Sequence, residues 1–184
     1  MFTRVHFVLV TVLVSGLLAF VGARISEAEE GGKPKPINLA LFDPIQIVSR
    51  DQSVKGFRFS LLYGRNANMQ GLDLGLVAMS DQDFKGVQLA LVGLTNGNFK
   101  GLQWDTVGWV KGSFEGVQLG VVNGAKDMKW FQWGGVNYTE SAEGLQLALV
   151  NYTKSLDGIQ IGAINIAKNG FLPVFPFFNF HFAD

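Results

Sequence analysis

The chain has 184 residues, a formal net charge of zero and a sequence pI near 6.7, so it lacks the basic excess that indicates nucleic-acid binding. Hydrophobic residues make up 48% of the chain and charged residues 16%, and the 23 glycines and 16 phenylalanines are typical of turn-rich β proteins. No cysteine is present, which excludes disulfides, zinc–thiolate sites, thiol nucleophiles and a cysteine-linked lipid anchor.

The first 28 residues have the plan of a secretory signal. Arg4 supplies a short positive segment, an apolar run follows over residues 5–21, and small-x-small sites end at Ala23 and Ala28. We expect cleavage near residue 23 or 28. The apolar run is also close to membrane-spanning length, so an uncleaved anchor is the alternative.

Two further segments are expected after the signal. Residues 29–36 are polar and contain proline, which predicts a linker. Residues 37–184 predict one β-repeat domain, long enough to form a core of its own. With either form of the N-terminal segment, this domain is expected to lie outside the cytoplasm.

A repeated unit fills most of the predicted domain. In each unit a glycine stands two residues before a polar residue, and apolar residues alternate with small or polar ones. Period-two alternation bounded by turn residues predicts one main β-strand per unit. The step is 15 residues at first and 14 later, and Trp130 replaces one glycine. The polar column consists of Arg58, Asp73, Gln88, Gln103, Gln118, Gln132, Gln146 and Gln160.

Two all-β architectures fit one strand per unit. A β-solenoid stacks its coils in parallel, so every unit repeats the same residues in the same places. An antiparallel barrel reverses each successive strand, so its natural period is two strands. The repetition in every single unit favours a solenoid-like stack of about eight units of 14–15 residues. The alternative is an antiparallel barrel of about ten strands, of outer-membrane type, because an export signal precedes strands that end in alternating aromatics.

Within a solenoid, the alternation predicts which residues face the core. We expect the face of Val87 and Leu89 to pack inward, and the chain to turn a corner at Val92 and Leu94. The glutamine column, if outward, would give a flat surface. A column of asparagines is expected to form a ladder at the corner, where amides can bind neighbouring coils. Its members are Asn123, Asn137, Asn151 and Asn165.

The array is flanked by two atypical segments, over residues 37–48 and 171–182. Both are predicted to be strands that close the array. Pro173 and Pro176 suit an edge or a cap, because proline cannot donate to a sheet ladder.

The chain resembles a family of uncharacterised exported surface-repeat proteins of bacteria with outer membranes. The resemblance rests on "GFRFSLLYGRNANMQGLDLGLV" at residues 56–77, on the later units of the type "GVQLGVVN", and on "LPVFPFFNFHF" near the end. It covers nearly everything after the signal. It implies a bacterial source and a surface or envelope location, and it supplies no catalytic residue.

Candidate catalytic residues are few. His181 is the only histidine beyond the signal, so neither a serine–histidine site nor a histidine-based zinc site is indicated. Acidic residues stand singly in predicted turns, where charge normally serves solvation. A carboxylate pair that cleaves sugars would have to come from these turns. They are Asp81, Asp83, Asp127, Glu140, Glu143 and Asp157. The spacing of calcium-binding β-rolls is not repeated, and no cofactor or metal residue is assigned.

One unit has an unusual composition. Asp105 takes a small-residue position between Trp104 and Trp109, and Trp130 and Trp133 follow two units later. Exposed indole rings would offer a platform for a sugar or a protein. The interpretation we favour at this point is that the four tryptophans fill wide layers of the core.

Together these patterns predict a non-enzymatic, exported repeat protein that presents a flat β face at the cell envelope. The expected partner is an envelope protein or a glycan, with no nucleic acid and with association with the outer membrane open. The expected location is the surface, outer membrane or periplasm of a Gram-negative-type bacterium. A small outer-membrane barrel and a carbohydrate-binding or carbohydrate-cleaving solenoid are the alternatives.

Overall fold

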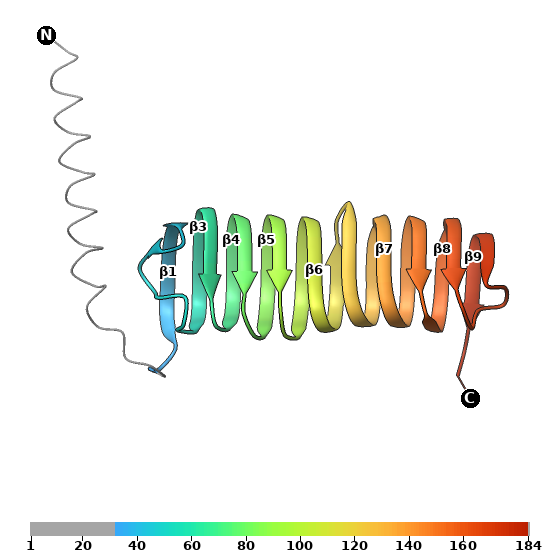
Figure 1. Ribbon diagram of the computed structural model, residues 1–184, viewed down its shortest axis with the longest axis horizontal. Helices are drawn as coiled ribbons and strands as arrows, with labels where there is room; N and C mark the ends of the chain where they lie inside the picture. The colour runs from blue at the N-terminus through green and yellow to red at the C-terminus, as the bar shows by residue number, and fades with distance from the viewer. Residues whose placement is uncertain (1–31, 184) are drawn as a thin grey trace, which may run out of the picture.

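The structure, a computed structural model, describes residues 32–183, so the expected signal and the first residues of the expected linker lie outside the described residues. The described chain forms coils that stack along one long axis (Figure 1). Its strands are β1 (Lys35–Phe42), β2 (Ile45–Gln46), β3 (Val54–Asn66), β4 (Met69–Ser80), β5 (Phe84–Thr95), β6 (Phe99–Leu119), β7 (Val122–Thr153), β8 (Ser155–Ala167) and β9 (Val174–His181).

Successive coils pair in parallel and in register. Gln88 lies opposite Gln103 and Gly86 opposite Gly101, as the shared columns of the sequence require. Pairing is antiparallel only at the two ends of the described sheet, between β1 and β2 and between β8 and β9. The predicted β-solenoid is therefore confirmed. The barrel alternative is wrong, because neighbouring barrel strands would pair antiparallel.

Each coil is a flattened loop with two sides, as β5 illustrates. The first side runs from Phe84, which is buried, through Gln88, and the chain turns a corner at Leu91. The second side returns with Gly93 inward, directly across from Gln88. A Cβ at Gly93 would collide with the Gln88 side-chain oxygen, so the two sides lie only one side chain apart. A polar turn then leads to the next coil.

Along the strands that lead to the corner, the inward residues are polar and the outward residues are apolar, which is the reverse of the predicted orientation. Every residue of the glutamine column is fully buried, whereas Val87 and Leu89 lie on the outer surface and Leu91 is 54% exposed. The prediction was wrong because it gave the more apolar set of alternating residues to the core. Buried amides are tolerated when their hydrogen bonds are satisfied, and parallel stacking supplies those bonds.

The glutamine ladder supplies these bonds in one direction. The Nε2 group of each glutamine donates to the Oε1 atom of the glutamine one coil earlier, over 2.6–2.9 Å. At the first step Gln88 Nε2 donates to Asp73 Oδ2 over 3.0 Å. Asp73 is in turn paired with Arg58, so an ion pair closes the N-terminal end of the ladder.

Two further columns lie in the interior. Phe84, Phe99 and Phe114 stack with ring centroids 4.4 and 5.1 Å apart, and they share the apolar core with Met69 and Met128. The predicted asparagine ladder is confirmed in the shorter coils, with Nδ2–Oδ1 distances of 2.8–3.0 Å. The asparagines lie at the first inward position after the corner, where they also bind backbone carbonyls of the next coil.

The glycine column has a steric origin that can be tested. Gly86 has a φ of 141°, and a Cβ there would collide with the carbonyl oxygen of Gly71. We expect Gly86→Ala to lower the free energy of unfolding by at least about 1–2 kcal/mol, the cost of the backbone conformation, to which the collision adds, measured by urea denaturation. Trp130 occupies the same column at a φ of 97°, so Trp130→Gly is the matched control and should not lower the midpoint. An unchanged midpoint for Gly86→Ala would contradict this account.

Candidate functional site: the outer apolar surface

The corner of the coils forms a row of exposed apolar side chains along the solenoid. We call this the corner row; its apolar members are Leu61, Leu62, Leu76, Leu91, Val121 and Leu149. Thr106 and Gly135 interrupt it. Leu149 is 69% exposed, although a fully buried leucine side chain would contribute about 1.5–3 kcal/mol. A row of exposed apolar side chains of this kind marks an interaction surface more often than a free surface.

Charged rows border the apolar surface on both sides of the coils. On the first side the row contains Lys55, Lys85, Lys100, Glu115, Lys129 and Glu143. On the second side it contains Asp81, Lys111, Lys126, Glu140, Lys154 and Lys168. Several members pair between coils, for example Lys100 with Glu115 over 2.7 Å. The cross-section of the solenoid is therefore amphipathic, with an apolar corner opposite a charged, polar edge.

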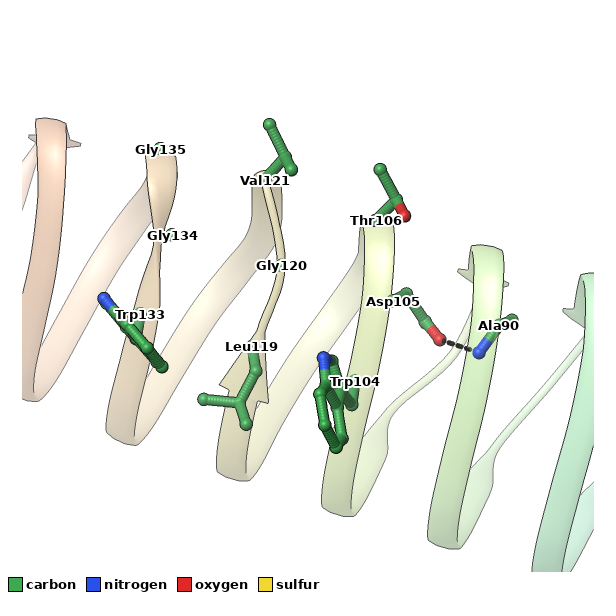
Figure 2. A pocket seen from close by; sticks show the side chains of 10 residues that line it. All are labelled: Ala90, Trp104, Asp105, Thr106, Leu119, Gly120, Val121, Trp133, Gly134 and Gly135. Atoms are coloured by element: carbon green, nitrogen blue, oxygen red, sulfur yellow. Dashed lines mark hydrogen bonds between the residues drawn. The ribbon is translucent and has the colours of Figure 1, made fainter.

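A depression of about 650 Å³ lies in this surface where the corner row is interrupted. Figure 2 shows Trp104, Leu119 and Trp133 on three successive coils along one side of the depression. Gly120 and Gly134 lie between these residues and the corner at inward positions, where an added Cβ would collide with Asp105 O and Gly120 O, whereas Gly135 leaves the corner itself without a side chain. The side chains of Trp104 and Trp133 are 62% and 58% exposed, so the prediction that the tryptophans fill the core was wrong.

The other two tryptophans also lie outside the core. Trp109 stacks on Tyr138, and Tyr138 on Tyr152, with centroids 5.8 and 5.1 Å apart, along the second side. Trp130 lies on the first side at the level of the charged row, beside Lys100 and Glu115. On both sides of the coils, aromatic side chains therefore lie at the boundary between the apolar and the charged surface.

Asp105 lies under the depression with its side chain inside the solenoid. Its Oδ1 atom accepts a hydrogen bond of 2.7 Å from the Ala90 backbone N–H, and its Oδ2 atom has no partner among the described residues. Burial raises the pKa of Asp105 to about 7, against the smaller lowering effect of the bond from Ala90. A carboxyl group of this kind is neutral in mildly acidic solution and charged in mildly basic solution.

The raised pKa of Asp105 predicts stability that falls as pH rises. The unfolded chain loses this proton near pH 3.8 and the folded chain near pH 7. The stabilisation by the protonated carboxyl group is therefore complete below pH 3.8 and is lost as the pH rises through 7. We expect a loss of about 2 kcal/mol between pH 5 and pH 7. Asp105→Asn keeps an acceptor oxygen and removes the titration, so thermal melts of both proteins isolate the effect. If the difference in melting temperature between the wild type and Asp105→Asn stays constant from pH 5 to pH 7, the predicted pH dependence is wrong.

The remaining candidate residues are not brought together. Glu140 and Glu143 form ion pairs with lysines, and Asp81 pairs with Arg65. Asp105 is the only acid among the residues that line the depression, so the depression lacks the two carboxylates of sugar cleavage. His181 lies half-buried in β9. Within residues 32–183 no group of histidine and acidic side chains has the arrangement of a metal site.

The described range also contains no helix that is long and apolar enough to cross a membrane. In comparisons with known proteins, no family model, no curated protein and no solved structure matches the chain.

Proposed function

We propose that this protein is a non-enzymatic repeat scaffold of the bacterial cell envelope that acts by presenting the outer surface of its solenoid to a partner. The observation that supports this most directly is the outward position of apolar residues, above all the corner row, around the buried glutamine ladder. Monomeric soluble proteins seldom expose contiguous apolar patches beyond a few hundred Å². Repeated strands provide an extended binding face of this kind.

The envelope location in this proposal comes from the sequence. The N-terminal 28 residues have the pattern of an export signal, and the repeats resemble those of exported surface proteins. The non-enzymatic part is supported by the depression, which offers exposed indole rings and one buried acid. These groups suit adhesion to an apolar or flat partner better than acid–base chemistry, which needs a positioned pair.

Cysteine labelling tests whether the outer surface is covered in cells that produce the protein. The chain has no cysteine, so Leu91→Cys in the corner row and Lys111→Cys in the charged row each provide one thiol. Both wild-type side chains are exposed in the described chain. In the isolated envelope fraction, a water-soluble maleimide should modify the first thiol several-fold more slowly than the second.

After unfolding in urea, the two thiols should react at the same rate, which controls for intrinsic reactivity. Equal rates in the envelope fraction as well would mean that the corner row is uncovered there, and the proposed function would be wrong.

A further inference from the structure

We infer that the partner of the outer apolar surface is one leaflet of a lipid bilayer, into which the solenoid inserts its corner edge-on. This inference rests on the proposed function and names its partner. It follows from four features of the described residues: the two-sided distribution of apolar side chains, the depth of the apolar band, the residues at its boundary, and the pairing of the backbone at the corner.

The apolar surface continues around the corner onto both sides of each coil. In β5 it includes Val87 and Leu89 on the first side, Leu91 at the corner, and Val92 and Leu94 on the second side. A second copy of this chain, or a flat protein partner, would cover one side and leave the other in water. Acyl chains are fluid and can surround both sides at once, which is why the distribution favours lipid.

The depth of the apolar band matches a single leaflet. On the first side, Leu91 lies four residue steps beyond Val87, which at the strand rise of about 3.3 Å per residue gives about 13 Å. On the second side, Leu94 lies three steps beyond Leu91, or about 10 Å. The hydrocarbon core of a bilayer is about 30 Å thick, so the band would extend through most of one leaflet of about 15 Å without crossing it.

The boundary of the band has the residues of a membrane interface. Trp109, Tyr138 and Tyr152 form a stacked row on the second side, between the corner and the lysines of the charged row. On the first side Trp130 follows Lys129 in the chain and lines a shallow depression together with Lys100 at the corresponding level. Tryptophan and tyrosine gather at headgroup depth, and lysine side chains extend to reach the aqueous phase.

The backbone at the corner is compatible with hydrocarbon. A strand group that enters lipid needs a hydrogen-bonding partner within the protein. Coil-to-coil pairing provides this on both sides, and at the corner Val121 N–H donates to Thr106 O over 2.9 Å and Gly135 N–H to Val121 O over 2.9 Å. Within this stretch of the corner, insertion would not require breaking a backbone hydrogen bond.

The natural tryptophans test the inference directly. Two full-length variants each retain one tryptophan, Trp104 or Trp130, with the other three changed to phenylalanine. Trp104 lies two residues from the corner and Trp130 at the charged row. Purified variants are mixed with vesicles of phosphatidylcholine and phosphatidylglycerol whose acyl chains carry bromine near their midpoint. We expect at least about twofold stronger quenching of Trp104 than of Trp130, because quenching requires near contact with the acyl chain.

The N-terminal residues 1–31 contain no tryptophan, so any binding through them leaves this comparison unaffected. A variant with Leu91→Ser and Leu149→Ser in the Trp104 background should lose most of the quenching, whereas Lys111→Gln should keep it. Circular dichroism confirms that each variant is folded.

Two outcomes would overturn the inference. Equal quenching of the two tryptophans, or none, would show that the corner does not enter lipid. If Trp104 is not quenched by the lipid but its emission shifts on dilution, the surface pairs with a second copy. In that case the thiol of the Leu91→Cys variant would still be protected in the envelope fraction, so the result would support the proposed function and contradict the lipid inference. If the corner row is labelled freely in the envelope fraction and Trp104 is not quenched preferentially, both the proposed function and the lipid inference are wrong.

Discussion

Replacing Asp73 with asparagine is expected to lower the free energy of unfolding by about 3–5 kcal/mol, because Arg58 is then buried without its counter-charge. Neither side chain has exposed surface, and Arg58 donates from Nε and Nη2 to the two carboxylate oxygens over 2.8 and 2.7 Å. Asparagine preserves the shape of Asp73, so the effect reports the lost charge and not a cavity. Urea denaturation followed by circular dichroism measures it.

A second ion pair provides the matched control. Arg65 and Asp81 are bound over 3.0 Å, but both are partly exposed, so Asp81→Asn should lower the free energy of unfolding by less than about 1 kcal/mol. Repeat proteins unfold in neighbouring units, so hydrogen exchange in Asp73→Asn should rise first in β3 and β4. Losses of equal size for the two substitutions would contradict the account of the buried pair.

A double substitution separates the charge from the ladder. Changing both Arg58 and Asp73 to glutamine extends the neutral amide chain from Gln88 by two steps. We expect this variant to regain most of the stability lost in Asp73→Asn, because no buried charge remains and the donor and acceptor of each amide are again matched. Recovery should be incomplete, since Arg58 also donates to the Met79 carbonyl over 2.8 Å.

Interrupting the ladder at its middle should have an effect of similar size. Gln118 donates to Gln103 Oε1 over 2.7 Å and accepts from Gln132 Nε2 over 2.6 Å, and all three are fully buried. Gln118→Leu leaves one buried acceptor and one buried donor without partners. At about 1–3 kcal/mol for each unsatisfied group, the expected loss is about 2–6 kcal/mol by urea denaturation.

The last glutamine of the ladder is the control for this prediction. Gln160 Oε1 has no hydrogen-bond partner within residues 32–183, so Gln160→Leu deprives only the Gln146 side-chain oxygen of its bond within the ladder. Its effect should therefore be about half that of Gln118→Leu. If the two substitutions lower the midpoint equally, the ladder is not the source of the stability, and lost packing would explain both.

The period and the parallel pairing of this fold could be predicted from the sequence, because stacking one coil on the next repeats each column. Orientation could not be predicted from hydrophobicity alone, because both sets of alternating residues contain aliphatic side chains. A better signal was present. Phe84 and Gln88 fall on the same side of the strand, while Lys85 falls on the side of Val87 and Leu89. A charged lysine must reach water, so that side had to be the outer one.

The candidate site was only partly predictable. Trp104 alternates with Gln103 and Asp105, so its outward position follows once the orientation of the glutamines is known. The depression combines exposed side chains from successive coils with the bare corner position of Gly135, and this combination appears only when the coils are stacked. The raised pKa of Asp105 likewise depends on burial between the two sides of a coil, which no single segment of sequence reveals.

The common direction of the glutamine ladder affects how such a chain can change length during evolution. Each amide from Gln103 to Gln146 offers the same acceptor to the coil after it and the same donor to the coil before it. Duplication of a gene segment that encodes one unit would thus insert a coil with both partners already in place. The ladder ends in different groups, with the Arg58–Asp73 ion pair at its N-terminal end and the antiparallel strand β9 at its C-terminal end. Lineages can gain or lose whole units between these ends and so vary the length of the outer surface.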